Sequence, residues 1–427
     1  MSAKDAEQTR IAMAALGLAK RGDFAALLAM FAPAPQRRLT AAAIDSAWQS
    51  HVGRHGAVWS MEPTEVHSAS SVTEVAVILR TASTALKAVV SLDGRGRLLN
   101  LQVTPLPAPW RPADYAAPDS FDEFEVVLGD RPLAVGGTVS VPRASEPVPA
   151  VVLLGGGGPF DRDMTMGNNR IGKDLAWGLA SRGIAVARFD KPAHTHPNLV
   201  AKRVDFTPTD DYVPYGAAAV DLLRAYPPVD SSRIVIVGHS MGGSYAPRVA
   251  VARPEVAGVV LLAAEAEPMN RAAVRVMNYL ADLDPASPTL RDAAATMVEL
   301  AANVDSPQLT RRTDPRTLPF GYSGAYWLGV RDYDPIATAR QADVPMLILQ
   351  GGRDYQVTVD DDLSLWRAAF DDRADVAIRV YDADDHLFFP GSGPSTPAGY
   401  EPSQHVDASV VGDIAEWIAT LNGDQPA

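Results

Sequence analysis

A serine flanked by glycines is the strongest chemical signal in the chain. The segment Gly238-His239-Ser240-Met241-Gly242 directly follows an apolar run, Ile234–Val237, and precedes a stretch with helical spacing, Ser244–Ala252. A serine on a sharp turn between a strand and a helix is a nucleophile elbow, and its glycines keep the tight turn clear of its neighbours. A glycine-serine turn without function is the alternative, but the strand-to-helix context favours a serine that attacks acyl carbonyls.

A serine nucleophile needs a base, because its hydroxyl is unreactive at neutral pH, and the base needs an orienting carboxylate. In a sheet of this type the order along the chain is serine, acid, histidine, which leaves His386 and His405 as candidates. His386 follows the strand candidate Val376–Tyr381 by a short loop. It therefore lies at the carboxyl end of a strand, where ligands collect, and is the predicted base.

Several carboxylates could orient this histidine. Asp354 lies in the turn after the strand candidate Met346–Leu349 and is the predicted acid. Glu265 and Glu267 follow an earlier strand and are its rivals. Asp384-Asp385 is too close in sequence to His386 to orient it and is expected to form the turn before it.

The glycine loop Gly155–Gly158 follows the first parallel strand candidate and could approach a tetrahedral intermediate closely. An oxyanion hole needs backbone N–H donors, one from the residue after the nucleophile and one from this loop. We expect Met241 to give the first donor and Gly157 the second, with Gly156 as the alternative. A phosphate-binding loop is the competing interpretation, but no Lys-Ser or Lys-Thr pair follows the glycines.

Weaker predictions concern the substrate pocket and bound groups. His194 and His196 could ligate a metal, but without a third ligand we predict neither a metal nor a cofactor. Arginines of the helical region could bind an acidic substrate, although exposed helix faces are the alternative: Arg271, Arg275, Arg311 and Arg312. Residues next to the catalytic segments are expected to line the substrate pocket, with core packing as the alternative for the aromatic ones: His239, Phe160, Tyr355, Gln356, Tyr326 and Trp327.

The elements that must position these residues divide the chain. A length of 427 residues exceeds the roughly 250–300 at which single cores stop growing. Residues 1–103 predict a small α+β domain, and residues 104–120 a proline-rich linker. Residues 121–424 alternate apolar strands with helices, which indicates a mostly parallel, doubly wound α/β sheet. Within them, residues 265–342 lose the alternation and are expected to form a helical cap.

Composition excludes several partners. The chain has 51 acidic and 38 basic side chains, a formal charge of −13, which argues against nucleic-acid binding. Its apolar runs are far shorter than the about 20 residues of a membrane span, so no membrane contact is predicted. The apolar stretch Ile11–Ala19 lacks a small-residue cleavage site, and we expect an amphipathic helix in a cytoplasmic protein. Nothing indicates an oligomeric state.

The chain also resembles a known family, the α/β-hydrolases that carry an N-terminal domain of unknown function, DUF3887, and that are described as dienelactone-hydrolase-like, S9-peptidase-like or acyl-thioesterase-like. The resemblance covers nearly the whole chain and is clearest in these segments: Gly158-Pro159-Phe160-Asp161-Arg162-Asp163, Phe189-Asp190-Lys191, Gly238-His239-Ser240-Met241-Gly242-Gly243, Gly351-Gly352-Arg353-Asp354-Tyr355-Gln356-Val357 and Asp385-His386-Leu387-Phe388.

This resemblance implies a triad of Ser240, Asp354 and His386, and it implies that residues 8–103 are the family's N-terminal domain. One departure concerns the glycine loop. Where relatives have His-Gly-Ser-Gly, this chain has Gly155–Gly158, and the histidine that usually braces the loop is missing.

These observations predict a serine hydrolase that cleaves a carboxylic ester, lactone or thioester of a small molecule through an acyl-enzyme on Ser240. The first alternative is an acyltransferase or cyclase that uses the same triad. A binding module without turnover is disfavoured because all three triad positions are filled, and a peptidase is disfavoured because nothing indicates a propeller or extended groove.

Overall fold

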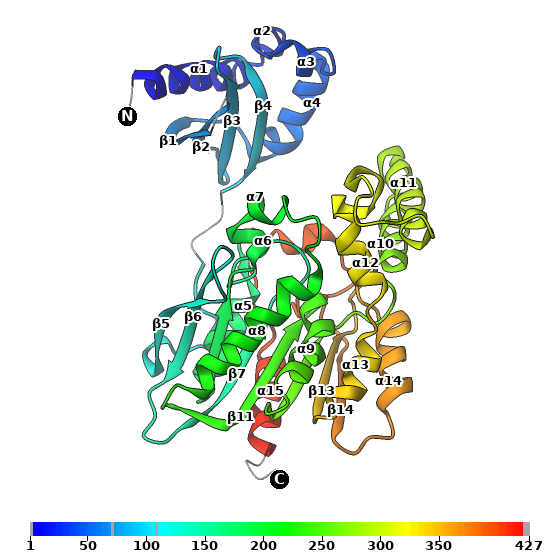
Figure 1. Cartoon of the computed structure of the whole chain (residues 1–427). Coiled ribbons are helices and arrows are strands. Elements are labelled where there is room, and N and C mark those ends of the chain that lie inside the picture. The colour runs from blue at the N-terminus through cyan, green and yellow to red at the C-terminus, as the bar shows by residue number, and fades with distance from the viewer. Residues whose placement is uncertain (1–2, 70–71, 107–109, 422–427) are drawn as a thin grey trace. The chain divides into compact units, whose positions relative to one another are not determined.

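The computed structural model describes residues 3–69, 72–106 and 110–421, and the chain divides into two compact units, residues 1–108 and 109–427 (Figure 1). The first unit packs four helices beside an antiparallel sheet with the strand order β1-β2-β3-β4. This unit therefore has the mixed helix and strand content that the sequence predicts for residues 1–103. The elements are α1 (Ala3–Lys20), α2 (Phe24–Ala29), α3 (Pro33–Gln36), α4 (Ala41–His51), β1 (Ser60–Ala69), β2 (Val72–Arg80), β3 (Ala85–Asp93) and β4 (Leu98–Pro105).

The proline-rich segment 104–120 is only partly a linker. The boundary between the units falls inside it, but the residues after the boundary pack on the second unit. Trp110 donates a hydrogen bond to Asp174 and meets Trp177 edge-on, with the ring centroids 5.0 Å apart. The prediction of a linker through residue 120 is therefore wrong for its second half, because an aromatic side chain fixes this segment by tertiary contact.

The second unit is built on an eight-stranded sheet with the order β14-β13-β12-β11-β7-β10-β6-β5. The six strands from β14 to β10 in this order pair in parallel, which confirms the mostly parallel sheet; β6 pairs antiparallel with β10, and β5 at the edge pairs antiparallel with β6. The sheet strands are β5 (Phe121–Leu128), β6 (Val135–Pro142), β7 (Val148–Leu154), β10 (Ala185–Phe189), β11 (Val229–His239), β12 (Gly258–Leu262), β13 (Met346–Gly351) and β14 (Val376–Tyr381). A two-stranded ribbon, β8 (Thr165–Met166) and β9 (Asn169–Arg170), stands apart.

Helices cover both faces of this sheet, as predicted (Figure 1). Helices α5 (Ile171–Ala180) and α15 (Ala408–Thr420) share one apolar core with the sheet. The opposite core joins α8 (Pro208–Arg224), α9 (Met241–Ala252) and α14 (Ser364–Phe370) to the other face. Two single-turn helices, α6 (Pro192–Thr195) and α7 (Pro197–Val200), follow β10.

The predicted cap is helical but shorter than expected. Helices α10 (Met269–Leu283), α11 (Pro288–Asp305) and α12 (Gly324–Arg331) form the insertion between β12 and β13. The last helix of the predicted range, α13 (Pro335–Ala342), instead contributes Ala339 to the core under the sheet. Its apolar face is therefore part of the sheet layer, and the cap ends before it.

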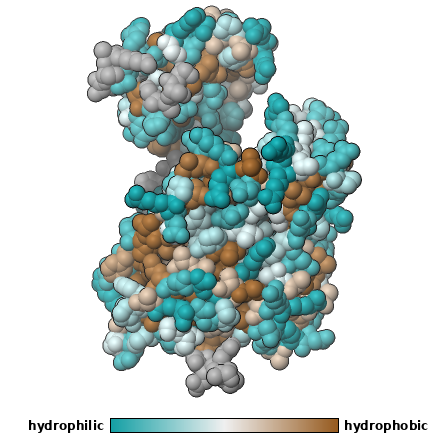
Figure 2. Space-filling model, in the orientation of Figure 1, coloured by the Kyte–Doolittle hydropathy of each residue, from teal (hydrophilic) through white to brown (hydrophobic). Residues whose placement is uncertain are grey.

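The surface of the molecule is mixed in hydropathy. Figure 2 shows mostly hydrophilic residues on the face in view, with hydrophobic residues in several separate groups. Across the described part of the chain, no helix is both long and apolar enough to cross a bilayer.

Candidate active site

The nucleophile elbow has the strained backbone that its motif predicts. Strand β11 ends at His239 and α9 begins at Met241, so Ser240 occupies the turn with φ 54° and ψ −126°. A positive φ is unfavourable for a residue with a side chain and persists only where the surroundings enforce it. A Cβ added at Gly238 would lie 2.2 Å from the Gly242 carbonyl oxygen, and one at Gly242 would lie 2.4 Å from the Gly155 carbonyl oxygen. The turn therefore requires both glycines.

The structure brings the three predicted triad residues together. The Nε2 atom of His386 lies 3.1 Å from Oγ of Ser240, and its Nδ1 atom lies 2.7 Å from Oδ2 of Asp354. All three side chains are buried, with relative exposures of 5–7%. The arrangement forms a relay in which the serine proton can pass to a histidine that a carboxylate orients.

The electrostatics suit His386 as a base. Burial lowers its pKa, but the charge and hydrogen bond of Asp354, with a contribution from Glu265, outweigh burial and leave the pKa raised. Asp354 is in turn held by the backbone N–H groups of Gln356 and Val357, at 2.7 Å and 3.0 Å from Oδ1. The carboxylate is thus fixed before any substrate binds.

His239, the second residue of the elbow, supports the base instead of competing with it. Its Nε2 atom donates to the backbone carbonyl of His386 at 2.8 Å, and the two rings lie 4.9 Å apart. Burial first, and then the neighbouring His386, lowers the pKa of His239 to about 3. His239 is therefore neutral at physiological pH and holds the turn that carries His386.

The glycine loop lies directly against the elbow. A Cβ at Gly156 would be 3.4 Å from Cβ of Ser240, and one at Gly157 would be 3.5 Å from Sδ of Met241. Gly156 and Gly157 also line the cavity that contains Ser240. The predicted oxyanion donors, Met241 and Gly157 with Gly156, are therefore all next to the nucleophile.

A cavity of about 280 Å³ opens onto the nucleophile, and its walls are mostly apolar. Phe160, Gln356 and His239 line it, as expected. Side chains of the cap, of the segment from the loop after β7 through β8, and of the first residue of α5 supply most of the rest: Met164, Met166, Ile171, Met269, Ala272, Ala273, Val276, Met277, Phe320 and Tyr322. The contribution of α10 could have been found in the sequence, because Met269, Ala273 and Val276 recur at helical spacing.

Three predicted pocket residues do not line this cavity, so those predictions are wrong. Tyr355 stacks on Tyr279 of α10, with the ring centroids 5.1 Å apart, outside the cavity. Tyr326 is buried behind the elbow and its hydroxyl donates to Sδ of Met241 at 3.4 Å. Trp327 is fully buried in the small core of the cap. Packing contacts outside the cavity therefore hold each of the three rings.

Of the rival acids, Glu265 belongs to the site without being the partner of His386. It lines the cavity beside the Ser240 hydroxyl. Burial, followed by the charge of Asp362, raises its pKa to about 7. Glu267 turns away and pairs with Arg275 at 2.9 Å. The sequence offered Glu265 only as an alternative to Asp354, whereas the structure places both carboxyl groups in the site.

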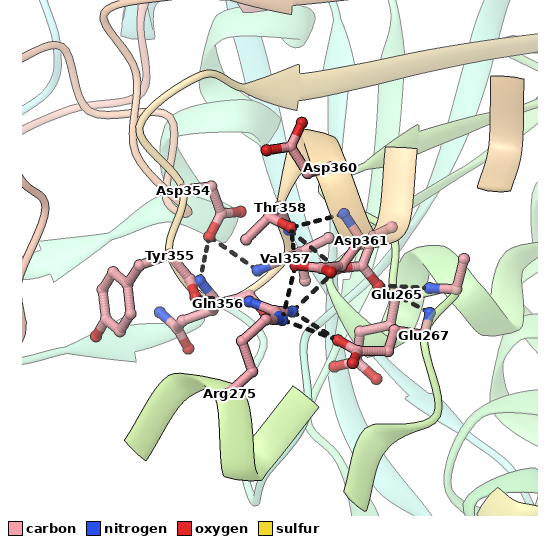
Figure 3. Close-up of polar contacts among 12 residues, drawn as sticks. Glu265, Glu267, Arg275, Asp354, Tyr355, Gln356, Val357, Thr358, Asp360 and Asp361 are labelled. Carbon is pink, nitrogen blue, oxygen red and sulfur yellow. Dashed lines mark hydrogen bonds and ion pairs between the residues drawn. The ribbon is translucent and has the colours of Figure 1, made fainter. Parts of the chain in front are cut away.

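The acid turn is tied to the cap through Arg275 of α10, as Figure 3 shows. Its guanidinium donates to the backbone carbonyls of Tyr355 and Gln356, both at 3.1 Å. It also forms ion pairs with a group of carboxylates: Glu267, Asp361 and Asp362. Asp362 accepts hydrogen bonds from the backbone N–H groups of Ala266, Glu267 and Thr358. Arg275 is therefore a structural link and not a free substrate cation.

The remaining candidates have structural partners or face solvent. His405, the alternative base, binds Asp174 at 3.0 Å. His194 and His196 each bond to a backbone carbonyl, of Pro159 and Ala134. Residues 3–69, 72–106 and 110–421 contain no group of three side chains suited to a metal ion. Arg271, Arg311 and Arg312 are exposed.

The sequence and fold have clear relatives. Residues 169–389 match the family described as serine aminopeptidase, S33. Esterase EstD of Thermotoga maritima is 33% identical over 339 residues, which are 78% of this chain and 76% of that protein. The 2,6-dihydropseudooxynicotine hydrolase of Paenarthrobacter nicotinovorans is 30% identical over 139 residues, 33% of this chain and 34% of that protein.

A solved structure supports the fold. The acylaminoacyl peptidase of Pyrococcus horikoshii superimposes with a TM-score of 0.50 at 13% identity, covering 86% of this chain and 57% of that chain. The assignment of residues 8–103 to the DUF3887 type is not tested by these matches and stays a prediction. The family match, the extended similarity to EstD and the mixed sheet with its helices agree: the chain belongs to the α/β-hydrolase family described as serine aminopeptidase, S33, and is an enzyme of the α/β-hydrolase type.

Proposed function

We propose that this enzyme cleaves carboxylic esters, lactones or thioesters of small molecules. The observation that carries the proposal is the relay of 3.1 Å and 2.7 Å contacts that ends on a strained serine at an apolar cavity. The similarity to EstD, whose printed name is esterase, supports an ester as the bond that is cleaved.

The geometry supports a two-step reaction. Oγ of Ser240 attacks the acyl carbonyl while Nε2 of His386 takes its proton, and Asp354 stabilises the resulting imidazolium. The backbone N–H groups of Met241 and Gly157 receive the oxyanion. The intermediate collapses when His386 gives the proton to the leaving oxygen or sulfur. Water, deprotonated by His386, then attacks the acyl-enzyme and releases the free acid.

The cavity limits the substrate. At about 280 Å³, with methionine and aliphatic walls, it suits the apolar acyl group of a small molecule. No cofactor takes part in the proposed reaction, and the cytoplasmic location inferred from the sequence belongs to the same proposal.

A fluorophosphonate probe together with a panel of p-nitrophenyl esters and thioesters tests this proposal. We expect wild-type protein to be labelled and to hydrolyse the panel, whereas Ser240→Ala is unlabelled and its kcat falls by about 10³-fold or more. Ser232→Ala, at an exposed strand position, is the matched control and should behave as wild type.

Two results would contradict the proposal. Labelling of wild type no stronger than that of Ser240→Ala would show that the serine is not activated. Formation of an acyl-transfer product in preference to free acid, when an alcohol or amine is added, would assign the same triad to a transferase.

A further inference from the structure

Lys191, Asp211 and Tyr212 form a buried polar cluster behind the glycine loop. The Lys191 and Asp211 side chains are each 3% exposed, and their Nζ and Oδ2 atoms lie 2.8 Å apart. The Lys191 ammonium also donates to the Tyr212 hydroxyl at 2.8 Å and to the carbonyl of Gly156 at 3.1 Å. The Tyr212 hydroxyl donates to the same carbonyl at 2.8 Å. Two buried donors thus converge on one backbone oxygen of the loop.

Stability alone does not explain this cluster. The desolvation of a buried ion pair usually cancels most of its Coulombic gain, and apolar residues of similar volume often serve a fold as well. The pair is also incompletely satisfied, because Oδ1 of Asp211 is buried without a hydrogen-bond partner in the described structure. An arrangement that costs stability in this way calls for another role.

The position of the carbonyl suggests that role. The Gly156–Gly157 peptide bond is trans, so its C=O and its N–H point in opposite directions. The C=O is held on the side of Lys191 and Tyr212. The N–H of Gly157 therefore points the other way, to the side on which Gly156 and Gly157 line the cavity with Ser240.

We propose that Lys191 and Tyr212 are positioning residues of the oxyanion hole. By holding the Gly156 carbonyl they fix the orientation of the Gly157 N–H. The ammonium also polarises the peptide, since a hydrogen bond to the carbonyl strengthens the bond that the N–H of the same unit donates. Lys191, two residues after the end of β10, thus holds the glycine loop that follows β7.

The charge of Lys191 reaches the cavity. Burial is the largest influence on Glu265 and raises its pKa, whereas Lys191 acts in the opposite direction. A group that affects a carboxyl beside Ser240 also acts on an oxyanion formed there, because electrostatic effects are strong in a site with little water.

The double variant Lys191→Met/Asp211→Asn tests the proposal, since it removes both charges and leaves no unpaired ion. With a p-nitrophenyl ester we expect kcat to fall about 10- to 100-fold while KM changes little. This decrease is no larger than the roughly 100- to 1000-fold decrease in kcat that follows removal of a whole oxyanion donor. Inhibition by an alkyl trifluoromethyl ketone, whose adduct carries the oxyanion, should weaken by the same factor.

Tyr212→Phe keeps the ion pair and removes one donor, so it tests the proposal even if the double variant does not fold. We expect a smaller fall of kcat with the same unchanged KM. Arg188→Met removes an equally buried cation that contacts Asp163 and Glu123 but not Gly156, and should leave kcat unchanged in the folded protein.

An unchanged kcat in both Lys191→Met/Asp211→Asn and Tyr212→Phe would overturn the proposal. So would a fall of kcat that leaves trifluoromethyl ketone inhibition as in wild type, because the cluster would then act on something other than the oxyanion. Fluorophosphonate labelling of wild type separates either result from a failure of the hydrolase assignment itself.

Discussion

Ser240 and Asp354 both follow parallel strands of the same sheet, β11 and β13, yet only the turn around Asp354 is tied to the cap by charged side chains. The elbow around Ser240 is fixed by backbone packed on backbone, with glycines where any Cβ would collide. The turn around Asp354 also begins with glycines packed on backbone, Gly351 and Gly352, but charged side chains hold it in addition, through Arg275 of the cap and the carboxylates around it.

The difference concerns what each turn can tolerate. Close backbone packing cannot relax by rotating a side chain, so the elbow has one permitted geometry. An ionic cluster depends on the partner that supplies its cation, and here that partner is an inserted helix. The acid turn can therefore respond to movement of the cap, while the nucleophile stays in place.

Gly242→Ala should give the largest effect, because its Cβ would lie 2.4 Å from one backbone oxygen and 2.5 Å from another. We expect a loss of at least about 3 kcal/mol in the free energy of unfolding, measured with urea, and no measurable esterase activity. Gly412→Ala is the matched control, since nothing lies within 4 Å of its Cβ in α15, and it should be neutral or slightly stabilising. An active and stable Gly242→Ala enzyme would contradict the steric account of the elbow.

Sequence reasoning identified the three residues that the structure brings together, because their positions follow local rules. A motif at a strand-to-helix junction and two turns after apolar strands placed Ser240, Asp354 and His386 at one edge of the sheet without knowledge of tertiary contacts. The antiparallel strands β5 and β6 were missed, and in β5 Glu123 and Glu125 interrupt the apolar pattern. Their partners, such as Arg188 and Arg162, come from distant segments.

The aromatic residues of the cap could not be placed by local reasoning, because their positions also depend on tertiary contacts. Whether an aromatic residue of the cap faces the substrate or a hydrophobic core depends on how helices pack, which is why Tyr326 and Trp327 were wrongly placed. The same holds for Lys191: a lone lysine after a strand carries no signal of the carbonyl it will meet.

Arg275→Ala should have an intermediate effect that tests the ionic side of the comparison. It removes two donors from the backbone of the acid turn and leaves Asp362, which is 1% exposed, without its cation. We expect the free energy of unfolding to fall by about 1–3 kcal/mol and kcat/KM for a p-nitrophenyl ester to fall about tenfold.

Arg271→Ala lies one turn earlier on the same helix, is exposed and serves as the matched control. The free energy of unfolding and the kcat/KM of Arg271→Ala should equal those of wild type. If Arg275→Ala keeps the kcat/KM of wild type, the acid turn does not depend on the cap.

Glu265→Gln should give the smallest effect, a shift in the pH profile of kcat/KM. The base must be neutral to act, and its raised pKa keeps His386 protonated to a higher pH than an ordinary histidine. The charge of Glu265 contributes to that increase, so the neutral amide should lower the pKa of His386 and move the acid limb to lower pH. Because Glu265 itself has a pKa of about 7, and faces Asp362 and Lys191 as well, the wild-type limb reports both groups together.

Glu267→Gln is the control for this shift, because that side chain pairs with Arg275 and does not line the cavity with Ser240. Its acid limb should stay where the wild-type limb lies. A limb that moves to higher pH in Glu265→Gln, or does not move, would show that Glu265 does not act on the base. A shift in Glu265→Gln alone would show that a titrating carboxyl group acts on the base next to Ser240. The charge of a neighbouring side chain would then tune the reaction even where close backbone packing fixes the position of the nucleophile.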